Sequence, residues 1–276
     1  MKELITYMGF DSNLSCSGFK YEVGKSYNAD SINTICKSGF QSYENPLDVL
    51  DYYPFIKDKI NRYYKVRVDN ILAESLISND SKILSIDITI LEELTISDLL
   101  KATISKYSIY PKAFVSNLHK QCITASDTIY NLTTCAERLL VTGHYNYIRA
   151  FIQDTVILVI GHHNYIVVDN IQTVVGIFGD NNEIIVLSDN NYIYIEGNNN
   201  KVYVKGKDSI IKNLGTNNTI EISNTCHIKS TRLSTIVDIS ENALLNKEVA
   251  FFQLDNENTW YLADNGKFSI DKPYVE

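Results

Sequence analysis

Proline is scarce in this 276-residue sequence, and its four prolines avoid one long stretch. None lies between Pro111 and Pro273. Proline cannot donate a hydrogen bond to a strand ladder, so a stretch without it suits strands whose N–H groups are all paired. The absence favours a continuous sheet-like structure over most of the second half of the chain.

Cysteine is also sparse, with five residues and no Cys-x-x-Cys pair. A sparse, odd set is not typical of a disulfide scaffold and suits a reducing compartment, so we expect a cytoplasmic protein. No apolar run reaches 18 residues, and no signal-peptide core follows the Met-Lys start. The sequence therefore indicates neither a membrane span nor secretion.

Basic residues are in the minority, and the formal net charge is -8. A protein that binds nucleic acid by counterion release needs clustered Lys and Arg, so nucleic acid is not an expected partner. The acidic excess is concentrated in residues 233–276, which carry three basic and eight acidic side chains. A protein surface remains the expected class of partner.

Glycine, in contrast, recurs every 18 residues through the middle of the chain. The repeat places Gly143, Gly161, Gly179, Gly197 and Gly215 in register, each followed three residues later by Asn146, Asn164, Asn182, Asn200 or Asn218. Apolar residues recur in pairs nine residues apart, as in Ile184, Val186, Ile193 and Ile195. Such a period predicts a solenoid. We predict a flattened parallel β-solenoid with two strands per turn and about six coils over residues 125–232.

The repeated corners carry specific expectations. The glycines are expected to provide positive φ angles, and the five asparagines are expected to form a side-chain ladder. A calcium-binding β-roll needs several carboxylates at its corners, and only Asp180 is present in the five Gly-x-x-Asn corners. His144, His162 and His163 lie on adjacent corners, and we interpret them as solvated turn residues rather than zinc ligands. We expect no metal and no cofactor.

The outer faces of the two predicted strands differ. The second strand of each coil has apolar residues where a solvated sheet would carry polar ones: Val156, Leu158, Ile160, Val174, Phe178, Tyr192, Tyr194, Ile210 and Leu214. An apolar face of this extent rarely stays exposed. We therefore predict that it is covered by a second copy of the chain, by the N-terminal domain or by a target protein. A homodimer would hide the patch about a two-fold axis.

The two ends of the chain are predicted to form separate small domains. Residues 1–124 read as an α+β domain. Its expected elements are strands at Ile5–Phe10, Phe19–Val23 and Tyr63–Val68, a helix at Pro46–Tyr52 capped by Asn45, and a helix from Ser97 to Tyr107. Residues 233–276 read as a β cap with strands at Val249–Leu254, Thr259–Leu262 and Lys267–Ile270, the last two joined at Asn265-Gly266. The repeat slips near Leu233, where the apolar pair Val237 and Ile239 arrives one residue early. Trp260 and Tyr261 suit either capping or partner binding.

Three N-terminal segments carry a resemblance: residues Cys16–Tyr27 (CSGFKYEVGKSY), Cys36–Phe40 (CKSGF) and Asn45–Pro54 (NPLDVLDYYP). They resemble an uncharacterised family of phage and prophage proteins. Many members have β-coil-like repeats next and end with Asn-Thr-Trp-Tyr, as at Asn258–Tyr261. This chain has Gln41 and Tyr43 where members often have His and Cys, so no metal or acid–base role of that His is expected. The resemblance implies phage origin and no particular activity.

No constellation for catalysis is evident, since the sequence lacks a Gly-rich phosphate loop and a His–Cys–Asp set with ligand spacing. We predict a non-enzymatic, phage-type accessory protein in the host bacterial cytoplasm. It would bind a host protein complex, for instance inhibiting a CRISPR effector, and form a homodimer through its apolar face. One alternative is an ADP-ribosyltransferase-like enzyme with the solenoid as oligomerisation stalk, for which Glu92-Glu93 is the nearest acidic pair. A structural phage component is the other.

Overall fold

The computed structural model divides the chain into two compact units, with the boundary between Tyr107 and Ser108. It describes residues 4–16, 18–31, 39–55, 60–72, 81–114, 120–132, 138–151, 155–169, 173–230, 234–238, 251–252, 259–264 and 267–270. The boundary falls before residue 124, where the sequence repeat had placed the end of the first domain. Within the described part, no helix has the length and hydropathy needed to cross a bilayer.

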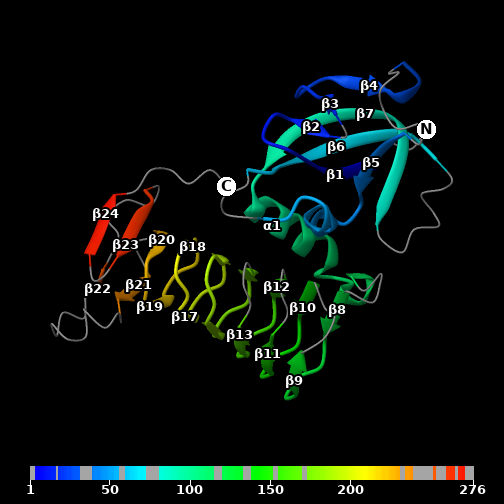
Figure 1. Ribbon diagram of the computed structural model, residues 1–276. Coiled ribbons are helices and arrows are strands. Elements are labelled where there is room, and N and C mark those ends of the chain that lie inside the picture. The colour runs from blue at the N-terminus through cyan, green and yellow to red at the C-terminus, as the bar shows by residue number, and fades with distance from the viewer. Residues whose placement is uncertain are drawn as a thin grey trace. The chain divides into compact units, whose positions relative to one another are not determined.

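The first unit is an antiparallel sheet that closes on itself (Figure 1). Its strands are β1 (Leu4–Phe10), β4 (Ser26–Asn28), β5 (Phe40–Tyr43), β6 (Arg62–Ile71) and β7 (Lys82–Leu94), in the order β4-β7-β5-β1-β6. An additional pairing between β6 and β7 completes a ring of four strands, because β7 pairs with β5 along its other edge. Between β1 and β4 in the sequence, β2 (Ser15–Cys16) and β3 (Phe19–Lys20) form a separate short antiparallel hairpin. The second expected strand is therefore shorter than Phe19–Val23.

Aromatic side chains fill the interior of this sheet. Phe10 contacts Tyr21 and Tyr64 edge-on, with ring centroids 5.1 and 5.3 Å apart. Phe40 and Val66 belong to the same buried cluster. Edge-to-face packing is the favoured geometry for such pairs. The Tyr- and Phe-rich motifs of this part of the sequence thus form its core.

Short helices complete the first unit: η1 (Ala29–Ser31), η2 (Pro46–Asp51) and α1 (Ile96–Tyr107). The predicted helix at Pro46 is a 3-10 helix, and the Asn45 side chain caps it by accepting the N–H of Leu47. The helix α1 begins at Ile96, one residue before the predicted start at Ser97. Thr95 caps it: its hydroxyl accepts the Asp98 N–H at 3.2 Å, and Asp98 accepts the Thr95 N–H at 2.9 Å. This is the reciprocal pattern of a capping box.

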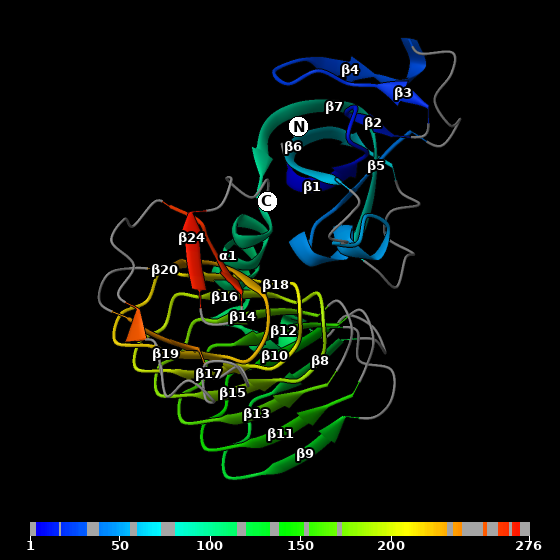
Figure 2. The same cartoon turned by 60° about the vertical axis from the view of Figure 1, so that its left-hand side comes forward.

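The second unit is the predicted parallel β-solenoid of about six coils, and this part of the fold prediction is confirmed (Figures 1 and 2). After η4 (Pro111–Phe114), one sheet contains β8 (Lys120–Ile123), β10 (Arg138–Val141), β12 (Val156–Val159), β14 (Val174–Ile177), β16 (Tyr192–Ile195), β18 (Ser209–Asn213) and β20 (Cys226–Ser230). The other contains β9 (Ile129–Leu132), β11 (Tyr147–Ala150), β13 (Tyr165–Val168), β15 (Glu183–Val186), β17 (Lys201–Val204), β19 (Thr219–Ile222) and β21 (Thr235–Asp238). β8 already pairs in parallel with β10, so the stacking begins before Ala125.

The 18-residue period becomes a stack of identical side chains inside the coil. Ile148, Ile166 and Ile184 are register partners on successive strands, and all are fully buried. The facing sheet contributes Ile157, Val175 and Ile193 in the same way, so the two inner faces meet in one apolar cluster. Strand alternation, which points every second side chain inward, explains why the apolar pairs are two residues apart.

The last coil departs from the period, and it does so earlier than the sequence analysis placed it. Ile210 pairs with His227 and Ile220 pairs with Ile236, so one residue is lost at β20 and a second at β21. Ile236 lies in the core. Ile239 is outside the described residues. The sequence assignment of this slip was therefore wrong in position and size.

Antiparallel strands close the far end of the solenoid, as the predicted β cap requires (Figure 2). β23 (Tyr261–Asp264) pairs with β20 and with β24 (Lys267–Ile270), and β22 (Phe251–Phe252) pairs with β21. Trp260 is buried and Tyr261 packs against the solenoid core. Pairing the last strands removes an edge open to aggregation. Asn265-Gly266 and most of Val249–Leu254 lie outside the described residues.

Candidate functional site

The outer apolar residues of the second strands, which the sequence suggested as an interface, are mostly buried within a single chain. Val156, Leu158, Val174, Tyr192, Tyr194 and Ile210 have exposed fractions of 0–3%. Ile160 and Phe178 are half-buried, and Leu214 is exposed. The face is covered in one chain, so its composition alone does not require a second copy. A homodimer through this face stays a prediction.

The five repeat glycines are required for a reason other than the expected positive φ angle. None has a positive φ angle; instead, a Cβ at Gly161 would lie 1.9 Å from the carbonyl oxygen of Gly143, one coil earlier. A Cβ at Gly179, Gly197 or Gly215 would lie 2.1, 2.0 or 1.9 Å, respectively, from the carbonyl oxygen of the glycine one coil earlier. The expectation of left-handed glycine corners was wrong. Glycine is needed here because successive corners touch through their backbones.

The five repeat asparagines form a buried ladder between coils. The side-chain oxygen of Asn164 accepts the backbone N–H of Asn146 at 3.0 Å, and the backbone N–H of Asn164 donates to the Asn182 side chain at 2.9 Å. The Asn164 side-chain amide also donates to the Gly143 carbonyl at 3.0 Å. The same backbone-to-side-chain hydrogen bond joins Asn182 to Asn200 and Asn200 to Asn218. This ladder satisfies corner N–H groups that no strand can reach, so its role is structural.

Positive φ angles occur one residue before each ladder asparagine. They are found at Tyr145, His163, Asn181, Asn199 and Asn217, with values of 54–57°, and Asp127 holds the equivalent position before Thr128 at 55°. Asn tolerates this conformation, whereas larger side chains are strained in it. Tyr145 and His163 therefore hold a conformation that later coils give to asparagine. A strained aromatic residue on an exposed corner is a pointer to function.

These two residues belong to a group of stacked rings, four of them exposed and two half-buried, which we call the aromatic rank. It consists of His144, Tyr145, Tyr147, His162, His163 and Tyr165, all on the coils of β11 and β13. The ring centroids of the three stacked pairs are 4.9 Å apart for Tyr145 and His163, 5.1 Å for Tyr147 and Tyr165, and 5.3 Å for His144 and His162. Tyr145 is 60% exposed and Tyr147 is 38% exposed.

The histidines of the rank also take part in a second ladder. The Nδ1 atom of His144 accepts the N–H of His162 at 3.0 Å, and Nδ1 of His162 accepts the N–H of Asp180 at 2.8 Å. The same coil position is filled by Asp180, Asn198 and Thr216 further along, and Asn198 accepts the Thr216 N–H at 2.9 Å. The Nδ1 atoms of the two imidazoles thus accept the hydrogen bonds that Asp or Asn side chains accept in later coils. Among the described residues, no group of three or more His, Cys, Asp and Glu is arranged to hold a metal.

Residues around the rank extend its apolar and cationic character. Ile129, on the preceding strand and in register with Tyr147, is 72% exposed. Arg149 is exposed and its guanidinium lies 5.0 Å from the ring centroid of Phe151. Burial of the Tyr165 hydroxyl raises its pKa, and nearby Glu183 adds to the rise. The hydroxyl therefore stays a neutral hydrogen-bond donor on this surface.

The acidic pair considered for ADP-ribosyl transfer lies in ion pairs of the first unit. Glu93 accepts two hydrogen bonds of 2.6 Å from the Arg62 guanidinium, and Lys65 contacts Glu92 at 3.0 Å. The hydrogen bonds from Arg62 hold the pKa of the Glu93 carboxyl below its usual value. Both carboxylates stabilise the pairing of β6 with β7, and neither lines the pocket described next.

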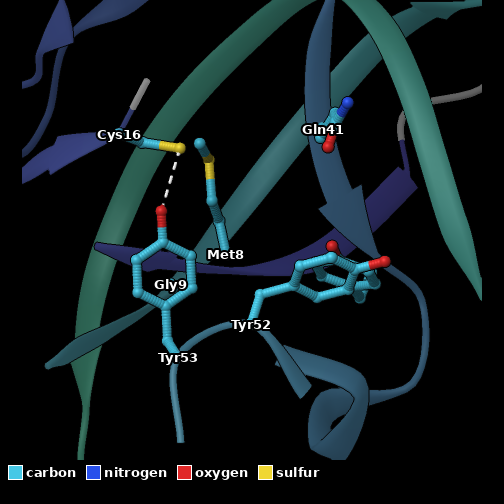
Figure 3. A pocket seen from close by; sticks show the side chains of 7 residues that line it. Met8, Gly9, Cys16, Gln41, Tyr52 and Tyr53 are labelled. Carbon is cyan, nitrogen blue, oxygen red and sulfur yellow. Dashed lines mark hydrogen bonds between the residues drawn. The ribbon is translucent and has the colours of Figure 1, made fainter. Parts of the chain in front are cut away.

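A pocket of about 280 Å³ lies in the first unit (Figure 3). Its lining residues are Met8, Gly9, Cys16, Gln41, Tyr43, Tyr52 and Tyr53. The Tyr53 hydroxyl donates to Cys16 Sγ at 3.2 Å on one side, and Tyr52 lies on the other with Gln41 above it. Burial, then the Cys16 contact, raises the pKa of Tyr53, which keeps the hydroxyl protonated. Gln41 and Tyr43 are thus both pocket residues.

Sequence reasoning found the coils but missed the aromatic rank and the pocket. The signal for the rank was present, since rings at Tyr145, Tyr147, His163 and Tyr165 occupy positions that are Asn, Glu, Lys or Thr in later coils. The pocket has no such signal, because residues far apart in sequence line it. Part of the CKSGF motif, Cys36–Ser38, lies outside the described residues, as does Asn258.

Comparison with known proteins gives one match. Residues 4–102 match the family described as Domain of unknown function (DUF7666), so the first unit is similar to an uncharacterised family. The match does not extend to the solenoid. No curated protein and no solved structure matches the chain.

Proposed function

We propose that this chain is a non-enzymatic binding protein that docks on another protein through the aromatic rank. One observation carries the proposal: on the coils of β11 and β13, stacked rings lie exposed at corner and strand positions that are polar in later coils. Tyr, Trp and Arg dominate the binding energy of protein interfaces. Rings that are already stacked lose little side-chain entropy on binding, which favours affinity.

The rest of the coil supports a scaffold role. The corner ladders place every ring of the rank on a backbone hydrogen-bonded to its neighbours above and below. Regular stacking gives a stiff, extended surface, which is how repeat proteins bind partners. Arg149 beside the rank adds a cation to the tyrosine-rich surface, a composition typical of interface hot spots.

The partner class follows from the motifs of the first unit. Their resemblance to phage and prophage proteins leads us to propose a host bacterial protein complex as the target and the host cytoplasm as the compartment. Inhibition of a defence complex, such as a CRISPR effector, is one form of this function. An ADP-ribosyltransferase activity is less well supported, because Glu92 and Glu93 are held in ion pairs outside the pocket.

Exchanges between coils test the proposal without disturbing the fold. In the rank variant, Tyr145→Asn, His163→Asn, Tyr147→Thr and Tyr165→Thr introduce residues that the same positions have at Asn181 and Thr219. The control variant carries Glu183→Thr and Lys201→Thr. These residues occupy the position of Tyr147 and Tyr165 in the two coils that follow the aromatic rank. Each tagged full-length protein is purified from bacterial lysate and its bound proteins are quantified by mass spectrometry.

We expect one stoichiometric protein partner with the wild type and the control variant, and at least a tenfold loss of it with the rank variant. Equal recovery by the rank variant would contradict the assignment of the surface. Turnover of a nicotinamide dinucleotide by the pure protein, absent from a Glu93→Gln variant, would replace the binding function with the enzymatic alternative.

A further inference from the structure

We propose that the pocket of the first unit binds the neutral ring of a nucleobase or nucleoside, stacked on Tyr52 and hydrogen-bonded to Gln41. The proposal concerns a small-molecule site and does not depend on the aromatic rank. At about 280 Å³, the pocket is close to the low end of the usual range for ligand sites, about 300–1,000 Å³. This size suits one planar ring system.

Tyr52 supplies the stacking surface. Its ring is 54% exposed although it packs on the buried Tyr43 ring, with centroids 5.3 Å apart and planes at 25°. Stacking on Tyr43 holds the orientation of Tyr52, and Tyr52 itself lines the pocket (Figure 3). A fixed, half-exposed aromatic ring is the platform on which nucleic-acid-binding proteins stack bases.

Gln41 supplies recognition of the ring edge. It lies on β5 between the buried residues Phe40 and Ser42, and β5 is hydrogen-bonded to β1 and β7, so the backbone of Gln41 is firmly held. Among the described residues, its half-buried side-chain amide has no hydrogen bond. An amide offers a donor and an acceptor side by side, which matches the adjacent acceptor and donor of adenine. We therefore expect adenosine to bind more tightly than the other nucleosides.

Contacts with Cys16 and Gly9 hold Tyr53, which forms the opposite wall of the pocket, in position. The Tyr53 hydroxyl is anchored on Cys16, and a Cβ on Gly9 would lie 2.4 Å from a ring carbon of Tyr53. Gly9 thus permits Tyr53 to pack directly on β1. The buried Met8 side chain lies between the two tyrosines (Figure 3) and offers a polarisable surface to a ring.

Electrostatics favour a neutral ligand. None of the described residues that line the pocket is Lys, Arg or His. Asp11 is close enough to Tyr53 to contribute to the raised pKa of its hydroxyl. An anionic phosphate would find no cation among these lining residues, so the pocket should prefer a nucleoside to its phosphate ester.

Ligand-observed NMR and calorimetry on the full-length protein test the proposal, with adenosine, guanosine, cytidine, uridine and adenosine monophosphate as probes. We expect saturation transfer to the base protons of adenosine, with a dissociation constant at or below the millimolar range, and weaker binding of the monophosphate. Saturation transfer to none of the probes at millimolar concentration would overturn the proposal. Tighter binding of the monophosphate would overturn the preference for a neutral ligand.

Variants distinguish the pocket from non-specific stacking. Tyr52→Ala and Gln41→Leu are each expected to weaken adenosine binding about tenfold, the scale of one lost stacking or hydrogen-bonding partner. Tyr52→Phe keeps the ring and should bind within about twofold of the wild type. Gly9→Ala should weaken binding by displacing Tyr53. Circular dichroism establishes that each variant is folded, and unchanged affinity in folded Tyr52→Ala and Gln41→Leu variants would overturn the site.

Discussion

His144 and His162 stack one coil apart with their ring planes 4° from parallel, and Nδ1 of His144 accepts the backbone N–H of His162. An exposed histidine pair usually suggests a metal or a proton relay. Here each ring instead replaces an Asp or Asn that satisfies the N–H of the next corner. The exposed faces of the same rings remain available to a partner, so structure and binding share these residues.

The acceptor role of the histidines predicts their tautomer and their tolerance to substitution. Both rings should carry their proton on Nε2, and long-range ¹H–¹⁵N correlation spectra at neutral pH should show an unprotonated Nδ1 in each. His162→Asn, which keeps an acceptor as Asn198 does, should change stability by less than about 0.5 kcal/mol. His162→Phe leaves the Asp180 N–H without its acceptor and should cost about 1–2 kcal/mol in a denaturant titration. Equal stability of the two variants would contradict the ladder.

The close approach of successive corners predicts a severe effect of one methyl group. Gly161→Ala forces a Cβ against the Gly143 carbonyl oxygen, a backbone atom that cannot move alone, and should lower the free energy of unfolding by about 3 kcal/mol or more. Gly24→Ala is the matched control, because Gly24 has positive φ and no atom within 4 Å of the added Cβ. It should cost about 1–2 kcal/mol from backbone strain alone. Denaturation midpoints of the two variants compare the mechanisms directly.

The asparagine ladder predicts a dependence on hydrogen-bonding groups rather than on size. Asn164 is buried and serves two backbone groups, so Asn164→Ala should cost about 2–4 kcal/mol. Asn164→Asp should cost at least as much, since a buried carboxylate faces the Gly143 carbonyl. Asn181→Gly, at an exposed corner with φ of 57°, should be nearly neutral. Thermal unfolding measures all three, and a neutral Asn164→Ala would show that the ladder contributes nothing.

Much of the solenoid could be predicted from the sequence because the same side-chain contacts recur in each coil. Identical residues stack on identical residues, so the repeat fixes coil length, strand pairs and inward positions. The reason for the glycines could not be derived in this way. A short distance between Gly161 and the Gly143 oxygen exists only once the coils are stacked, whereas positive φ is the commoner use of glycine. The slip at β20 was missed although the 18-residue period would place Lys229 at the inward position that Ile228 fills.

The candidate sites depended on information that local patterns do not carry. Leu158 and Tyr194 are buried in a single chain, and composition alone cannot say whether one chain or a partner buries such residues. Tyr145 was visible as an exception to the Asn of later coils, yet its φ angle and its stacking on His163 are three-dimensional facts. The pocket unites Met8 of β1, Cys16 of the β2–β3 hairpin, Gln41 of β5 and Tyr53 after η2, a meeting that no spacing in the sequence reveals.

The ion pair between β6 and β7 predicts a small pH effect of known sign. Arg62 lowers the pKa of folded Glu93, so the pair stabilises the fold above the unfolded pKa of Glu, and this contribution is lost as pH falls through the lowered folded value. Both side chains are substantially exposed, so the effect should be at most about 1 kcal/mol. Arg62→Gln should remove this contribution. The difference in stability between the wild type and Arg62→Gln, measured by denaturant titration, should therefore shrink as the pH falls from neutral to acidic. A wild type that gains stability on acidification relative to Arg62→Gln would have the wrong sign.

Site-specific photo-crosslinking in bacterial cells tests the central claim, that the aromatic rank is the docking surface, most directly. A photoreactive phenylalanine analogue replaces Tyr145 in one variant and Asn199, the same corner position three coils later, in the control. We predict a covalent adduct with one protein of defined mass from position 145 and none from position 199. No adduct from position 145, or the same adduct from both positions, would contradict the account.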